Sequence, residues 1–194
     1  MAERTANRHR ATKETDIEVS LDLDGSGRAE VSTGLPFFDH MLEQLGRHGG
    51  FDLVLKASGD LEVDAHHTVE DTGIVLGTAL AEALGDKAGV RRFASGLYPL
   101  DEALVQVALD LSGRPYLVYE VETSPERIGT FDPQLAEEFW RAFVTSAGIT
   151  LHLKTLSGRN GHHVLEASFK GVARSLRDAV RVDGAEVPST KGTL

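Results

Sequence analysis

The sequence contains no cysteine, which excludes disulfide scaffolds, thiolate zinc sites, iron–sulfur clusters and cysteine nucleophiles. It also lacks any run approaching the ~18 consecutive apolar residues of a transmembrane helix. Residues 1–13 are polar and basic, without the apolar centre of a secretory signal. We therefore expect a soluble, cytoplasmic protein that does not act at a membrane.

Basic residues are few relative to acidic ones. Lys and Arg number 20 against 30 for Asp and Glu, giving a formal net charge of −10. A general nucleic-acid binder needs a basic face to neutralise phosphates, so we do not expect that class of partner. A local cluster of cations on an acidic protein still suits a small phosphorylated substrate.

Alternating apolar and polar residues predict strands over residues 16–23, 28–33, 51–57, 103–111, 115–121 and 149–156. The first two flank a turn of Asp and Gly residues at 24–27, which predicts a β-hairpin. The pattern D-x-D-G-S-G from Asp22 also resembles the start of a calcium loop. Its twelfth position, however, is Thr33 rather than a bidentate Glu, so a turn explains the segment better.

Helical periodicity predicts four helices, over residues 36–48, 68–84, 132–147 and 163–182. Each half of the chain then follows the order strand, strand, helix, strand, helix. The sequence H-H-x-x-E occurs in both halves, 96 residues apart, each time between a strand and a long helix. The simplest interpretation is an internal duplication, with half-repeats 1–97 and 98–194 forming one compact catalytic unit. The predicted fold is α+β, with two sheets of about four strands and helices on one face of each.

The repeated motif indicates metal binding. In its first copy, His66 and Glu70 are four residues apart and share a helix face, and His67 lies three residues from Glu70. Adjacent histidines diverge by about 100° around a helix, so His66 and His67 suit two different ions better than one. Imidazole and carboxylate without thiolate suit Mn, Fe, Co, Ni or Zn. A single His-His pair at a helix start is usually a capping or solvated pair, whereas two copies favour two similar metal sites.

Other catalytic motifs are absent from the sequence. It has no H-E-x-x-H, G-x-S-x-G, Walker A or G-x-G-x-x-G pattern, which removes the main support for zinc-peptidase, α/β-hydrolase, P-loop and Rossmann functions. Several basic residues near predicted turns could hold a phosphate, but singly each is more typical of solvated surface charge. Only their convergence in space would make a site.

Four segments in order resemble the imidazoleglycerol-phosphate dehydratase family: FFDHML at 37–42, HHTVED at 66–71, DLSGRP at 110–115 and GHHVLEASFK at 161–170. The resemblance runs from about Arg10 to the C-terminal residues. It implies a carbon–oxygen lyase of histidine biosynthesis that removes water from imidazoleglycerol phosphate to give imidazoleacetol phosphate.

The resemblance also implies two manganese ions per active site, set between subunits of a homo-oligomer of 24 chains. The ligands by motif match are His40, His66, His67, Glu70, His162, His163 and Glu166. Many family members have a further His before a Phe pair in the second half, where this chain has Glu138-Phe139-Trp140. Glu138 is the second-half counterpart of His40, and we expect its carboxylate to replace imidazole on the metal.

Family contacts to the phosphorylated imidazole substrate fall on Glu14, Arg92, Arg114, Lys170, Ser189 and Lys191. Glu14 and Glu166 are the candidate catalytic carboxylates, with Glu14 matching the acid/base residue. The hypothesis is that metal-bound imidazole loses its ring proton and expels the side-chain hydroxyl, while a carboxylate moves protons.

Two alternatives differ from this function. A metal-storage assembly would share the histidines but would give no reason for Arg114, Lys170 and Lys191 to converge. A dinuclear-metal phosphohydrolase would usually have an Asp-rich ligand set, whereas these ligands are rich in His.

Overall fold

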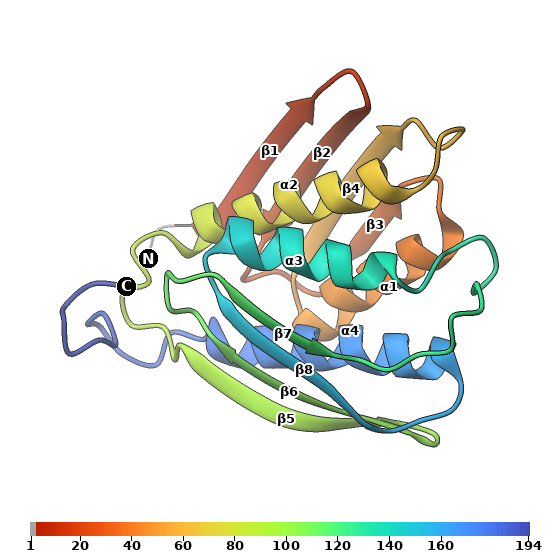
Figure 1. Cartoon of the computed structure of the whole chain (residues 1–194). Helices are drawn as coiled ribbons and strands as arrows, with labels where there is room; N and C mark the ends of the chain where they lie inside the picture. Colours follow the sequence, from red (N-terminus) through yellow and green to blue (C-terminus); the bar gives the residue numbers. More distant parts are fainter. Residues whose placement is uncertain (1–2) are drawn as a thin grey trace.

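The computed structural model describes residues 3–194 and confirms an α+β fold with two four-stranded sheets (Figure 1). The first half contains β1 (Thr5–Ala11), β2 (Thr15–Asp22), β3 (Ala29–Ser32), α1 (Pro36–Gly49), β4 (Asp52–Gly59) and α2 (His66–Leu84). The second contains β5 (Phe93–Leu100), β6 (Ala103–Asp110), β7 (Tyr116–Glu120), α3 (Leu135–Ala147), β8 (Thr150–Ser157) and α4 (Gly161–Ala179).

The two sheets have the same topology. In the order β1-β2-β4-β3, β2 is antiparallel to both of its neighbours, and β3 runs parallel to β4. The second sheet repeats this pattern as β5-β6-β8-β7. The expected duplication is therefore present in the backbone, with one more strand in each half than the sequence pattern predicts.

The predicted hairpin between residues 16–23 and 28–33 is wrong. Strand β2 pairs with β1 and β4, while β3 crosses to the far side of β4. Sequence reasoning missed β1 because it is an edge strand in which only Ala6 is buried, so it lacks an apolar alternation. The edge strand β5 was missed for the same reason, since none of its residues is fully buried.

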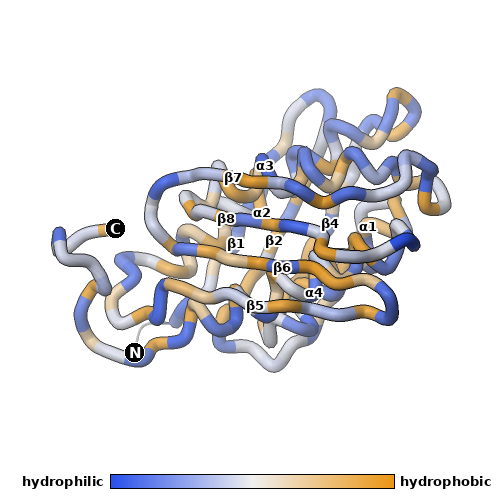
Figure 2. The backbone as a smooth tube through the Cα atoms, turned by 60° about the horizontal axis from the view of Figure 1, so that its bottom comes forward, coloured by the Kyte–Doolittle hydropathy of each residue, from blue (hydrophilic) through white to orange (hydrophobic). Residues whose placement is uncertain are grey.

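The four helices lie between the two sheets, with α2 against α3 and α1 against α4 (Figure 1). Aromatic side chains fill the middle of this layer, where Trp140, Phe139 and Phe169 are fully buried and pack within 5.5 Å between ring centroids. Figure 2 looks onto the second sheet, where hydrophobic residues recur along β6, and buried positions of β6 alternate with more exposed ones. Within residues 3–194 no helix has the length and apolar character needed to cross a membrane.

Two glycines let α2 approach α3 closely. A Cβ at Gly73 would lie 2.6 Å from the backbone oxygen of Phe139, and one at Gly77 would lie 2.5 Å from that of Phe143. Any side chain here would meet the α3 backbone, which cannot move aside as a flexible side chain can. These glycines therefore set the spacing between helices that belong to different halves of the chain.

Candidate metal centre and cationic cavity

At both H-H-x-x-E motifs a polar side chain just before the helix accepts a hydrogen bond from the first histidine: Asp64, which precedes the N-cap of α2, and Asn160, the N-cap of α4. The Asp64 carboxylate accepts a hydrogen bond from the backbone N–H of His66 at 2.7 Å, and the Asn160 side chain accepts one from His162 at 3.0 Å. Such caps satisfy amides that a helix start leaves unpaired. The two motifs therefore present their histidines from the first turns of α2 and α4.

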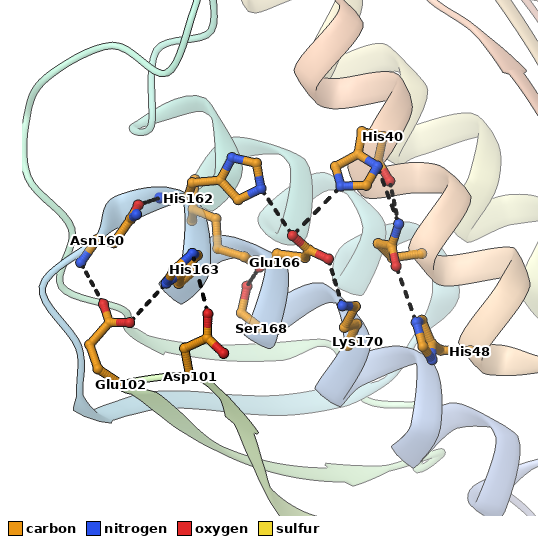
Figure 3. A network of polar contacts seen from close by, with 12 residues as sticks. His40, His48, Asp101, Glu102, Asn160, His162, His163, Glu166, Ser168 and Lys170 are labelled. Carbon is orange, nitrogen blue, oxygen red and sulfur yellow. Dashed lines mark hydrogen bonds and ion pairs between the residues drawn. The ribbon is translucent and has the colours of Figure 1, made fainter.

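One group of potential ligands converges within the chain (Figure 3). The ligand atoms of His40, His162 and Glu166 all lie within 4.8 Å of one another. Nε2 of His162 is 3.0 Å from Glu166 Oε2, and Nε2 of His40 is 3.6 Å from the same oxygen. Two imidazoles and a carboxylate from α1 and α4 make a donor set that fits a transition metal such as manganese.

Lys170 adds a cation beside this group. Its ammonium lies 2.5 Å from Glu166 Oε1, one helical turn along α4. Burial raises the pKa of Glu166, but the hydrogen bond and charge of Lys170, together with His162, outweigh it, and the pKa lies below its usual value. Glu166 is therefore ionised near neutral pH, as a ligand carboxylate must be.

Within the described residues, the other predicted ligands do not form a second group of three converging metal ligands. Nε2 of His66 lies 3.7 Å from Glu70 Oε2, within one helix. The Glu138 carboxylate faces Arg141 of its own helix at 3.9 Å and stays partly exposed. Among residues 3–194, only His40, His162 and Glu166 meet as a possible three-ligand group.

The second histidine of each motif contacts a carboxylate that sequence reasoning missed. His67 Nδ1 lies 3.0 Å from Asp60 Oδ2, and His163 Nδ1 lies 2.8 Å from Glu102 Oε2. Asp60 raises the pKa of His67, and Glu102 raises that of His163. In turn, His163 and the backbone N–H of Asn160 lower the pKa of Glu102 to about 2. Glu102 is 61 residues from His163, so no local signal marks it, whereas Asp60 lies only seven residues before His67.

Glu14 lies in the turn between β1 and β2 and is exposed. Its backbone N–H donates to Thr12 Oγ1 at 3.1 Å, and its carbonyl accepts from the backbone N–H of Asp60 at 3.1 Å. These bonds hold the turn beside the start of α2, and the charge of Glu14 contributes to the raised pKa of His67. The predicted acid/base residue is thus near a predicted ligand.

Most of the predicted substrate contacts converge elsewhere. Arg92, Arg114, Ser189 and Lys191 line one open cavity of about 590 Å³. Arg92 is held in place because it pairs with both oxygens of Asp110, at 2.7 and 3.1 Å, and donates to the carbonyl of Pro188. The Arg114 side chain is 68% exposed and is available to a ligand. Lys170 is absent from this cavity lining and lies with Glu166.

The cavity and the His40–His162–Glu166 group lie at opposite ends of α4. The backbone N–H of Arg92 bonds the carbonyl of Ala179 at the helix end, whereas His162 is at its start. At 1.5 Å per residue, these positions are separated by about 25 Å. A small phosphorylated substrate cannot span that distance within one chain.

The duplicated α+β fold brings imidazoles and a carboxylate together near helix starts and holds a separate cationic cavity. This combination is typical of a metal-dependent enzyme that acts on a small anion. A family model described as imidazoleglycerol-phosphate dehydratase matches residues 33–176. The chain belongs to this family.

Named relatives and solved structures agree with that assignment. The imidazoleglycerol-phosphate dehydratase of Acidothermus cellulolyticus is 59% identical, covering 98% of this chain and 93% of the relative. That of Parafrankia sp. is 60% identical, covering 98% and 99%. The crystal structure of the Pyrococcus furiosus dehydratase in complex with (S)-C348 is 39% identical, with a TM-score of 0.85, and covers 96% of this chain and all of that one.

Proposed function

We propose that this chain removes water from imidazoleglycerol phosphate to give imidazoleacetol phosphate, in the histidine pathway of the cytoplasm. The observation that carries the proposal is similarity to named dehydratases along nearly the whole chain. The converging histidines of α1 and α4 support a metal-dependent form of this chemistry. We further propose that the half-repeats 1–97 and 98–194 act as one catalytic unit.

Two manganese ions per active site are proposed as cofactors. Bound manganese would supply Lewis acidity for the imidazole and the hydroxyl groups of the substrate. The proposed ligands share imidazole or carboxylate donors on α1 to α4: His40, His66, His67, Glu70, Glu138, His162, His163 and Glu166. Glu138 faces Arg141, so its part in the ligand set requires that side chain to turn away from its own helix.

The remaining proposed roles belong to residues that hold substrate or move protons. Arg114, Ser189 and Lys191 bind the phosphate in the cavity that Arg92 shapes. Lys170 lies outside that cavity and contributes its positive charge to the substrate from beside Glu166. Binding energy from this remote phosphate orients the reacting carbons. Glu14 is the acid/base, and Glu166 is the second proposed catalytic carboxylate.

A homo-oligomer of 24 chains is proposed, with active sites between subunits. The separation of about 25 Å between cavity and metal group supports an intersubunit site, because one chain cannot offer both to one substrate. A second chain could place its cavity next to the His40–His162–Glu166 group of the first.

The test is reconstitution. Purified full-length protein is stripped with a chelator, supplied with Mn²⁺ and imidazoleglycerol phosphate, and assayed for the acetol product. We expect product only when the metal is restored. No product from assembled protein that binds Mn²⁺ would contradict the proposed reaction.

A further inference from the structure

The register of the two sheets makes Glu14 and Glu102 equivalent residues. Val19 pairs with Leu55 in the first sheet, and Val107 pairs with Leu153 in the second, at the same places in the two half-repeats. Counting back along β2 and β6 from these valines, the residue before each strand is Glu14 in one half and Glu102 in the other. The duplicated fold therefore holds two turn glutamates, each beside an H-H-x-x-E helix.

In the second half, the turn glutamate binds the motif directly (Figure 3). One carboxylate oxygen of Glu102 is 2.8 Å from His163 Nδ1. The other accepts hydrogen bonds from the backbone N–H groups of Asn160 at 2.9 Å and Arg159 at 3.2 Å. Both oxygens are thus used within the chain, which leaves Glu102 poorly placed to exchange protons with a substrate.

In the first half, the second histidine of the motif contacts a different carboxylate, which does not belong to the turn glutamate. The Asp60 carboxylate, in the residue that follows β4, is 3.0 Å from His67 Nδ1. The backbone N–H of Asp60 also bonds the carbonyl of Glu14, so Asp60 lies between the turn and the histidine. Among the described residues we find no hydrogen bond or ion pair formed by the Glu14 carboxylate itself, which is exposed.

The hydrogen bond determines which ring nitrogen can bind a metal. A carboxylate only accepts, so the Nδ1 facing it must carry the proton, and neutral imidazole then has its lone pair on Nε2. A carboxylate partner of this kind both orients a ligating histidine and makes it a better donor. Asp60 and Glu102 therefore act on equivalent histidines, His67 and His163, from different places in the fold.

We propose that Glu102 and Asp60 are positioning residues that hold His163 and His67 with Nε2 free for a metal, and that Asp60 thereby leaves Glu14 available for proton transfer. This inference rests on the metal ligands and on the role of Glu14 in the proposed function. It assigns different roles to two equivalent glutamates. Glu102 acts through a ligand, and Glu14 acts on the substrate.

The test is a double-mutant cycle on Mn²⁺ affinity, read from the free-ion signal in electron paramagnetic resonance of the metal-stripped full-length protein. We expect Glu102→Ala to weaken Mn²⁺ binding by roughly 10- to 100-fold. In a His163→Ala background the same change should add less than about twofold, because the residue acts through His163. Equal effects in both backgrounds, or unchanged affinity in Glu102→Ala, would overturn the proposal.

Two matched variants sharpen the result. Glu14→Gln, at the equivalent position, should leave Mn²⁺ affinity within about twofold of the parent protein, and a loss as large as that of Glu102→Ala would overturn the assignment of different roles. Ser157→Ala removes a 3.3 Å hydrogen bond to the carbonyl of Glu102 without touching His163, and should also leave the affinity unchanged. A large loss there would mean that the turn acts only structurally.

The positioning role is tested in the first half by measuring Mn²⁺ affinity of Asp60→Ala with and without His67→Ala. This second cycle tests the proposal if Glu102→Ala does not fold. Parent protein that binds no Mn²⁺ would overturn both this inference and the proposed cofactor. Parent protein that binds Mn²⁺ but forms no product would contradict the proposed reaction alone. In that case the cycle still supports or overturns the positioning role.

Discussion

The ammonium of Lys170 lies 2.5 Å from Oε1 of Glu166, whose other oxygen faces the rings of His162 and His40. One carboxylate thus lies between a fixed cation on its own helix and a candidate metal position. Because both side chains are largely buried, this contact is better insulated from solvent than an ordinary surface pair. We therefore expect Lys170 to contribute to binding of the phosphorylated substrate and not to binding of the metal.

Lys170→Met should leave Mn²⁺ binding as tight as in the parent protein or tighter, because it removes a positive charge next to the ion. It should also raise KM for the phosphorylated substrate by roughly 10- to 150-fold, since a charge-assisted contact is worth about 1.5–3 kcal/mol. Equilibrium dialysis with Mn²⁺ and steady-state kinetics measure the two effects. Weaker Mn²⁺ binding in Lys170→Met would contradict the prediction that Lys170 contributes only to substrate binding.

Glu14→Gln should lower kcat by about 10²- to 10⁴-fold, the range expected when a general acid/base is removed. The amide cannot exchange a proton, but it is almost the same size as the acid. Glu18→Gln is the matched control, because it makes the same change on an exposed position of the adjoining strand β2 and should leave kcat unchanged. Equal rates for Glu14→Gln and the parent protein would exclude the acid/base role.

The two arginines of the cavity should behave differently. Arg92→Ala removes both close hydrogen bonds to the largely buried Asp110 and leaves it only Arg114 at 3.8 Å, so we expect a loss of about 3 kcal/mol in the free energy of unfolding. Arg114 is mostly exposed, so Arg114→Ala should change stability by less than about 0.5 kcal/mol while raising KM roughly tenfold. Denaturant unfolding and kinetics on both variants test this, and the reverse pattern would contradict it.

Gly77→Ala should destabilise the protein by about 1–3 kcal/mol despite the better helix propensity of alanine. The added methyl would meet the backbone of Phe143 at 2.5 Å and push α2 from α3. Thr78→Ala, the next residue of α2, should cost less because its hydroxyl bonds only the carbonyl of Ile74 in the same helix. Thermal unfolding compares the two, and equal melting temperatures would show that the helices can separate without cost.

The Glu102–His163 pair should stabilise the metal-free protein most between about pH 4.5 and 6.5. The pKa of Glu102 is lowered from 4.5 to about 2, so its contribution is complete above 4.5 and is lost as the pH falls toward 2. The pKa of His163 is raised above 6.5, so its contribution is complete below 6.5 and is lost as the pH rises through the folded-state pKa.

The melting-temperature difference between the parent protein and Glu102→Gln, followed from pH 3.5 to 9, measures this dependence. We expect the largest difference inside that window and a smaller one on both sides. A difference that is constant across the range would show that the pair does not contribute through its charges.

Local sequence alone determined the helices and much of one site. Glu166 is four residues from both His162 and Lys170, the spacing that places side chains on one helix face, and both contacts are present. Periodicity placed every helix within a few residues, because a helix is built from contacts three and four positions apart. The duplicated motif likewise predicted the repeated architecture.

Only the tertiary structure decided which distant groups meet. Pairing of β3 with β4, rather than with β2, depends on partners outside the segment, so turn residues alone predicted a hairpin that does not form. The convergence of Arg92 with Lys191, and the contact of His163 with Glu102, join residues far apart in the sequence. Such contacts form because whole sheets and helices bury their apolar faces, and the position of each polar group then follows from the packing of the entire chain.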